Sequence, residues 1–294
     1  MDTPSSSDDK YRNIPLGVTI AVSEIVLMVG ISIFVKMLSL DISTPTILLF
    51  RYSLCLPLLI VTALWQRGRS AFRISRYKIL TMRIMAGLAS LSCLYAALSL
   101  MSLAKVMTLF QATPLFITFM APFILGETVG WRRWVAVLTG FVGVVVLLNP
   151  GAGAWSLTGV MFGLGSPVFA AIMMIMLRKL GQSDSPASTA IWYNGAGSIL
   201  FLLLFFWRGE EVPTADTGLW ILILIGVLSS FQQFFIAFSH RLAPASLLAP
   251  FRYLTVPVGI VAGIIFFDEA LTATIILGSL IIVGSSVFIL ARES

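Results

Sequence analysis

The stretch ALSLMSLAKVMTLFQATPLFITFMAPFILGETVGWRRWVAVLTGFVGVVVLLNPG, residues 97–151, decides the fold. It contains an apolar segment over residues 103–125 and a second over residues 133–148, and the short connection GETVGWR separates them. A helix that crosses the hydrocarbon core of a bilayer needs about 20 predominantly apolar residues. The stretch therefore predicts two membrane-spanning helices, the second of them short.

Apolar segments of this kind recur along nearly the whole chain. The composition agrees, because 58% of the 294 residues are hydrophobic and 11% are charged, whereas a soluble domain carries roughly 25% charged residues. The sequence therefore predicts an all-α integral membrane protein with ten transmembrane helices. We expect the spans over residues 16–38, 45–65, 79–101, 103–125, 133–148, 157–177, 187–207, 218–238, 246–267 and 272–290.

The basic residues are unevenly divided between the two sets of loops. With the N-terminus in the cytoplasm, the segments on the other side hold only Lys36, Lys105 and Arg208, while most of the remaining Lys and Arg residues fall in cytoplasmic segments. The positive-inside rule then predicts that both termini are cytoplasmic. The same rule accounts for the net charge of +6, so we expect a lipid bilayer and no nucleic acid as partner.

The two halves of the chain resemble each other. The stretch ASLLAPFRYLTVPVGIVAGIIFFDEALTATIILGSLIIVG, residues 245–284, repeats features of the first one, including a proline about three turns before an acid. Chance similarity between apolar helices is the alternative. Five spans in each half would give the halves opposite orientations, which is a common basis of alternating access about a midplane site. We therefore predict two inverted five-helix repeats. Their boundaries are a cytoplasmic tail over 1–15, repeats over 16–148 and 156–291, and a linker over 149–155.

The two quoted stretches resemble the conserved half of EamA-type members of the drug/metabolite transporter superfamily. The likeness runs from about Leu16 to Leu290, and the PFRY and GWRRW elements are similar to the subgroup with S-adenosylmethionine and riboflavin uptake proteins. The resemblance implies the two-repeat fold, transport of a small solute and a place in the inner (plasma) membrane of a bacterial-type cell. Glu127 and Glu269 recur in that family, and we interpret them as structural caps of the short span that follows each.

One residue departs from the family pattern. Asp268 stands before Glu269 where such proteins usually have glycine. This difference leaves the conformation of the local turn open, but not the fold.

Glu24 is a charged residue near the middle of the first span. A charge at the bilayer centre costs roughly 2.5–3.5 kcal/mol on the insertion scale, so it needs a cavity, an arginine partner or a bound proton. We predict that Glu24 is a substrate ligand and the candidate for proton coupling. A structural ion pair is the alternative.

Arg51 and Arg252 are charged residues inside other spans, and each is the centre of a Phe-Arg-Tyr triplet. We expect their guanidiniums to flank the midplane from opposite sides. The planar guanidinium fork suits a carboxylate or a phosphate, and caps on backbone carbonyls are the alternative. Arg83 lies close to a basic loop, and we expect it to anchor the topology.

Polar and aromatic side chains inside the spans complete the predicted substrate site. A buried amide needs a partner, and aromatic rings beside amides suit a planar or amphipathic solute, with interhelical hydrogen bonds as the alternative. Two intramembrane arginines and one glutamate give the interior a net positive charge, which favours an anionic or zwitterionic substrate. The family resemblance implies that this substrate is aromatic or nucleoside-like. The candidate residues are Glu24, Arg51, Tyr52, Tyr95, Gln111, Trp192, Tyr193, Asn194, Gln232, Gln233, Arg252 and Tyr253.

These features predict a secondary transporter of a small organic metabolite, coupled to a proton or to a counter-solute and present as a monomer or homodimer. Export of amphipathic drugs or amino acids is an alternative. A membrane enzyme or a structural partner protein is an alternative of another class. We expect no enzyme, because the sequence lacks an HExxH motif, a Walker motif and paired intramembrane His or Cys residues. Cys55 and Cys93 lie in apolar stretches, so we expect no disulfide framework, no metal and no cofactor.

Overall fold

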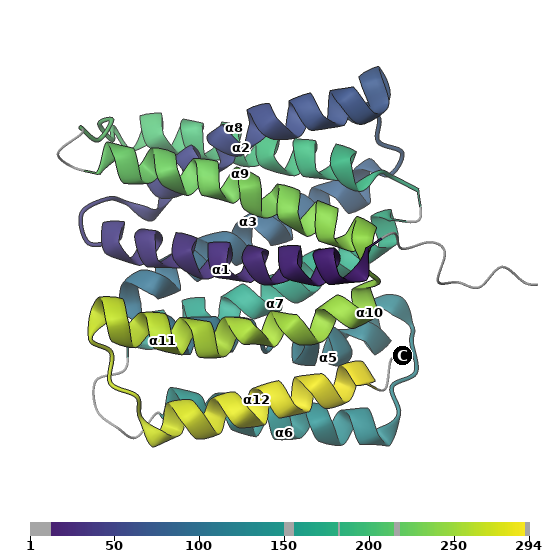
Figure 1. The fold of residues 1–294 in the computed structure, drawn as a ribbon, viewed down its shortest axis with the longest axis vertical. Coiled ribbons are helices and arrows are strands. Elements are labelled where there is room, and N and C mark those ends of the chain that lie inside the picture. Colours follow the sequence, from purple (N-terminus) through teal and green to yellow (C-terminus); the bar gives the residue numbers. More distant parts are fainter. Residues whose placement is uncertain (1–12, 150–155, 182, 215–217, 292–294) are drawn as a thin grey trace, which may run out of the picture.

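The computed structural model describes residues 13–149, 156–181, 183–214 and 218–291, and these residues form helices and turns without a strand (Figure 1). Ten helices in this part of the chain are long and apolar enough to cross a membrane. The all-α, ten-span prediction is therefore confirmed. Helices suit this environment because the bilayer core offers no partner for backbone N–H and C=O groups. Most of the predicted tail and residues 150–155 of the predicted linker lie outside the described residues.

Eight of the spans are continuous helices. The first amides of a helix lack a partner within the helix, and side chains cap several of these helices. At the start of α1, for example, Asn13 Oδ1 accepts a hydrogen bond from the Leu16 amide at 3.3 Å. The helices are α1 (Ile14–Leu38), α2 (Thr44–Arg67), α3 (Tyr77–Leu100), α6 (Trp131–Leu148), α7 (Leu157–Leu180), α8 (Pro186–Trp207), α9 (Leu219–Leu242) and α12 (Ala273–Ala291).

The other two spans are broken in the middle, although the sequence predicted them as continuous. One consists of α4 (Leu103–Phe110) and α5 (Thr113–Leu125). The other consists of α10 (Ala245–Leu248), the 3₁₀ segment η4 (Ala249–Leu254) and α11 (Thr255–Phe267).

Side chains satisfy the backbone groups that the two breaks set free. Gln111 Nε2 donates to the Arg252 carbonyl oxygen at 2.5 Å, and Thr255 Oγ1 donates to the same oxygen at 2.7 Å. Thr113 Oγ1 donates to the Phe110 carbonyl oxygen at 2.5 Å. Broken helices are tolerated at membrane depth when neighbouring groups supply such bonds. Both breaks therefore lie together in the interior.

The two halves pack in a repeated and inverted pattern. Helix α3 of the first half packs along α7 of the second, and the pair related to it by the repeat, α9 and α1, also packs together. Helix α12 lies beside α6, and α2 lies beside α8. Helix α1 begins and α12 ends at one face of the bundle, on the right in Figure 1, which we call the N-terminal face. Helix α7, the first of the second half, begins at the opposite face. The predicted inverted repeat is therefore present.

Gly126 and Asp268 end the broken spans in the same way. Both adopt the left-handed conformation, with φ of 69° and 50° respectively. Asp is one of the few residues besides glycine that enters this region at modest cost. The turn whose conformation the sequence left open therefore keeps the geometry of a glycine turn.

Candidate functional site

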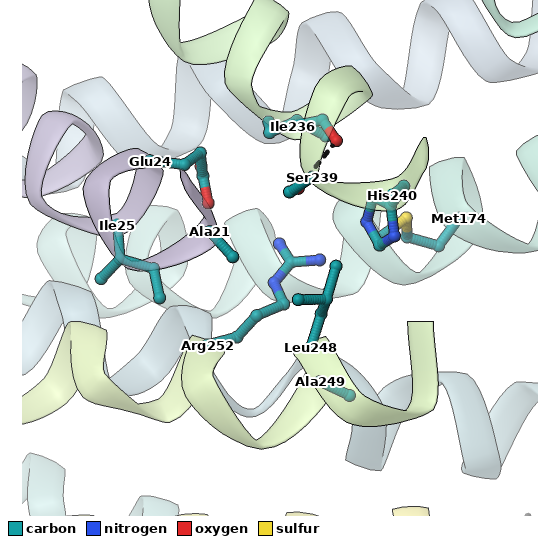
Figure 2. Close-up of a pocket in the computed structure, with 10 residues that line it drawn as sticks. All are labelled: Ala21, Glu24, Ile25, Met174, Ile236, Ser239, His240, Leu248, Ala249 and Arg252. Atoms are coloured by element: carbon teal, nitrogen blue, oxygen red, sulfur yellow. Dashed lines mark hydrogen bonds between the residues drawn. The ribbon is translucent and has the colours of Figure 1, made fainter. Parts of the chain in front are cut away.

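Two adjoining cavities lie in the half of the bundle nearest the N-terminal face. The smaller has a volume of about 290 Å³ and is bordered by α1, α7, α9, α10 and η4 (Figure 2). The larger has a volume of about 1040 Å³ and is bordered mainly by α2, α7, α8 and α9. They share four lining residues, Met174, Ile236, His240 and Arg252. Together they offer enough space for a metabolite, because ligand sites usually measure about 300–1,000 Å³.

Glu24 and Arg252 face each other across the smaller cavity. Figure 2 shows the Glu24 carboxylate on α1 and the Arg252 guanidinium on η4 pointing toward the same space. Glu24 is buried and accepts a hydrogen bond from Gln232 Nε2 at 3.0 Å. Arg252 is exposed to this space and lies within electrostatic range of Glu24. The arrangement can hold one anionic and one cationic group of the same solute.

The break in the ninth span positions Arg252. Its carbonyl oxygen is held by Gln111 and Thr255, so the backbone is fixed while the side chain extends into the cavity. The same carbonyl also accepts the backbone N–H of Thr255, in the tighter pattern of a 3₁₀ segment. Gln111, a predicted substrate ligand, therefore supports the backbone that carries Arg252, and Tyr253 lies buried beside it in η4.

Amide and aromatic side chains line part of the larger cavity. Gln233 lines it and donates from Nε2 to Asn194 Oδ1 at 3.1 Å. Phe234 and Phe238 line it as well, and their rings stack with centroids 5.7 Å apart and planes 11° apart. Aromatic faces of this kind stack on planar rings.

The remaining predicted residues lie elsewhere. Arg51, Tyr52, Tyr95 and Tyr193 gather between α2, α3 and α8, and none of them lines either cavity. Trp192 is 43% exposed and donates from Nε1 to the Phe72 carbonyl oxygen at 3.1 Å. The structure therefore divides the predicted set into a cavity group around Glu24 and Arg252 and a separate tyrosine–arginine cluster.

His240 and Met174 line both cavities but were not among the predicted ligands. His240 is the one histidine of the chain and lies near the end of α9. On α9 it follows Gln233 and Ile236 at intervals of three to four residues, which places all three on one helix face. That spacing was the signal in the sequence, whereas Met174 gave no signal beyond that of an ordinary apolar residue.

On the opposite face, Glu269 of the second half contacts residues of the first half. Its carboxylate accepts hydrogen bonds from the backbone amides of Leu103 at 2.6 Å and Ala104 at 3.3 Å, and it pairs with Lys36 Nζ at 3.1 Å. Lys36 Nζ also donates to the Met101 carbonyl oxygen at 2.5 Å. The interpretation of Glu269 as a cap of the following span is wrong, because it caps the N-terminus of α4 in the other repeat.

Glu127 is the counterpart of Glu269 on the N-terminal face. The same number of residues separates Glu127 from Glu269 as separates Lys36 from Arg178. Glu127 and Arg178 form an ion pair at 3.1 Å, but their side chains are 42% and 67% exposed, against 11% and 17% for Glu269 and Lys36. One pair is therefore largely buried between the two halves, and its counterpart lies at the surface.

Two carboxylates outside the spans have lowered pKa values. Burial acts to raise the pKa of Glu210, but hydrogen bonds from Ser43, Thr46 and Arg208 outweigh it and hold the pKa below its usual value. Asp184 behaves in the same way, because the Ser75 amide donates to its Oδ1 at 2.6 Å. Both residues fasten loops to helices and lie away from the cavities.

A sequence profile described as the EamA-like transporter family matches residues 15–149 and 157–291. The chain is 34% identical over 186 residues to the riboflavin transporter of Vibrio cholerae, covering 63% of this chain and 62% of that protein. It is 30% identical over 208 residues to the riboflavin transporter of Rhizobium johnstonii, covering 67% of this chain and 65% of that protein. The match thus spans less than two thirds of the length of these relatives.

Two further similarities extend this picture. The S-adenosylmethionine uptake transporter of Rickettsia prowazekii is 27% identical over 185 residues, covering 62% of this chain and 61% of that protein. A protein crystal structure shares the fold with a TM-score of 0.63 and 18% identity, over 95% of this chain and 98% of that chain.

Proposed function

The chain belongs to the EamA-like transporter family, and from this premise we propose that it carries a charged small organic metabolite across a membrane by alternating access. The proposal rests on Glu24 and Arg252, whose side chains face each other in the smaller of two adjoining cavities. The N-terminal face is cytoplasmic in this proposal, because most of the basic loops lie there. The membrane is the inner membrane of a bacterial cell.

The substrate class in this proposal is a planar ring that bears both a cationic and an anionic group. Arg252 binds the anionic group, Glu24 binds the cationic group, and the stacked Phe234 and Phe238 bind the ring. The names of two relatives, which specify riboflavin and S-adenosylmethionine, give the first compounds to test. S-adenosylmethionine fits this description because it combines a planar base, a sulfonium cation and a carboxylate.

The proposed mechanism of alternating access is an exchange between two ion-paired contacts that the repeat relates, which we call latches. One is formed by Glu269 and Lys36 and the other by Glu127 and Arg178. In the state described, Glu269 and Lys36 close the opposite face at the N-terminus of α4. In the alternate state, Glu127 and Arg178 make the equivalent contact with the N-terminus of α10 and close the N-terminal face. Inverted repeats permit this exchange, since each half can adopt the conformation of the other.

Transport and binding are tested separately on the purified chain. Proteoliposomes loaded with unlabelled S-adenosylmethionine should accumulate the labelled compound by counterflow, and empty liposomes should not. Riboflavin, a planar ring without charged groups, is the comparison that tests whether the two charges are needed. Arg252→Ala should weaken binding by roughly 10- to 150-fold, because a hydrogen-bonded contact to a charged group is worth about 1.5–3 kcal/mol. Arg132→Ala is the matched control, since Arg132 lies against the exposed ring of Trp131. Equal substrate affinity in both variants would contradict the assigned site.

A further inference from the structure

The place where the two cavities meet, which we call the junction, is lined by both His240 and Arg252. Figure 2 shows the imidazole ring and the guanidinium extending from α9 and η4 toward the same space, with Glu24 on the far side of the guanidinium. His240 lies within electrostatic range of Arg252. The two side chains therefore border one space from two different elements.

Both side chains have hydrogen-bonding capacity that the protein leaves unused. Each is exposed to the cavities. Within the described part of the chain, neither the His240 ring nor the Arg252 guanidinium makes a hydrogen bond or an ion pair. Glu24, by contrast, is already held by Gln232 at 3.0 Å. Two free donor groups that face one space suit an anion with two oxygens, such as a carboxylate or a phosphate.

The charges around the junction also favour an anion. Arg241 on α9 lines the larger cavity together with Arg252, and none of the described residues that line this cavity is acidic. The parts of α2, α7 and α8 that border it contribute apolar and hydroxyl side chains. The acid nearest to the junction is Glu24, in the smaller cavity. An anionic group is therefore most stable at the junction, and a cationic group beside Glu24.

The repeat indicates that the fold does not need polar residues at these two positions. At the spacing that relates Glu127 to Glu269, the counterparts of His240 and Arg252 in the first half are Leu98 and Phe110. Leu98 is fully buried, and Phe110 packs against the same core. Apolar side chains serve the equivalent packing positions in the other half, so a ligand explains the imidazole and the guanidinium better than packing does.

We infer that His240 is a second ligand of the substrate's anionic group. Its ring N–H and the Arg252 guanidinium each bind an oxygen of one carboxylate, and the planar ring of the substrate lies in the larger cavity. The inference deepens the proposed function and rests on it for the class of substrate. It adds a selection among anions, because a carboxylate or a phosphate can share its oxygens between the two donors.

Equilibrium dialysis of radiolabelled ligands against the purified full chain in detergent tests this subsite. Benzoate combines a carboxylate with a planar ring, whereas benzamide has nearly the same shape and no charge. His240→Leu should weaken the binding of benzoate by roughly 10- to 150-fold and leave the binding of benzamide unchanged. His240→Gln keeps an N–H donor and should recover part of the loss. Arg132→Leu removes an exposed positive charge outside both cavities and should leave the affinity for benzoate unchanged.

The single histidine of the chain offers a second measurement that does not depend on transport. When histidine is labelled with ¹³C at Cε1 and no histidine tag is present, His240 gives the one imidazole signal in the NMR spectrum. Benzoate should shift this signal saturably, and benzamide should not. In Arg252→Ala the benzoate titration should move to higher concentration by a similar factor, because the same carboxylate has lost its other ligand.

Two results would overturn the inference. One is a His240 signal that benzoate leaves unmoved, and the other is an equal loss of benzoate and benzamide affinity in His240→Leu. Failure of the proposed function is a separate result. A chain that binds benzoate through His240 but shows no counterflow of S-adenosylmethionine would contradict transport of that compound and keep the anion subsite.

Discussion

The Glu269 latch gives a quantitative prediction about which face of the transporter is closed. Glu269→Gln removes the charge that Lys36 pairs with and keeps one oxygen for the amides of Leu103 and Ala104. A hydrogen bond to a charged group is worth about 1.5–3 kcal/mol, and a carboxylate at a helix N-terminus adds about 0.3–1 kcal/mol. The substitution should therefore weaken the closed contact by about 2–3 kcal/mol. Each 1.4 kcal/mol changes a population ratio about tenfold, so the population open at this face should rise by roughly 30- to 140-fold.

The labelling rate of a single cysteine measures that population. Ala104→Cys is the reporter, because Ala104 is 3% exposed beside the Glu269 carboxylate, and Cys55 and Cys93 are first replaced by serine. A polar maleimide should label the reporter faster by the same factor in the Glu269→Gln background. When opening and closing are fast relative to labelling, the rate follows the equilibrium population of the open form.

Substitution of Glu127, the counterpart of Glu269, should have the opposite effect, and substitution of Glu211 is the control. Glu127→Gln should slow labelling of the same reporter, because Glu127 stabilises the alternate state, in which the opposite face is open. Glu211→Gln removes an exposed carboxylate and should leave the rate unchanged. Equal rates in Glu269→Gln and Glu211→Gln would refute the latch, and faster labelling in Glu127→Gln would refute the exchange between the two latches.

Three further predictions follow from single residues. Glu24→Gln should abolish the pH dependence of uptake into proteoliposomes if Glu24 is the coupling acid, and unchanged pH sensitivity would exclude it. Glu210→Gln should lower the free energy of unfolding by about 1–2 kcal/mol near pH 7. Because the folded-state pKa is lowered, this difference should be full above the usual pKa of 4.5 and vanish as the pH falls through the folded value. Gly197→Ala should destabilise by about 1–3 kcal/mol through its clash with Tyr52. Gly195→Ala should be neutral in the same thermal-unfolding assay, because its added Cβ would lie 4.0 Å from Leu56 Cδ2, an ordinary van der Waals contact.

Local sequence signals predicted the spans but missed their two interruptions. Hydropathy averages over about 20 residues, so the breaks at Gln111 and across Ala249–Leu254 are invisible to it. Prolines mark both neighbourhoods, yet Pro57 and Pro167 lie inside continuous helices. Whether a helix breaks near a proline depends on contacts from distant helices, and Gln111 holds the Arg252 carbonyl in one break from 141 residues away.

The sequence by itself determined the class of fold, the number of spans and the inverted repeat, because the bilayer imposes a length and a polarity on every span. It also identified Glu24 and Arg252 as charged residues inside the membrane, where a charge without a partner is costly. Only the tertiary structure decided how such residues are partnered. Glu24 meets Gln232 across 208 residues and Glu269 meets Leu103 across 166. Arg83 turns inward to Tyr193. These contacts depend on the rotation and packing of helices from opposite halves, which no local property of the chain encodes.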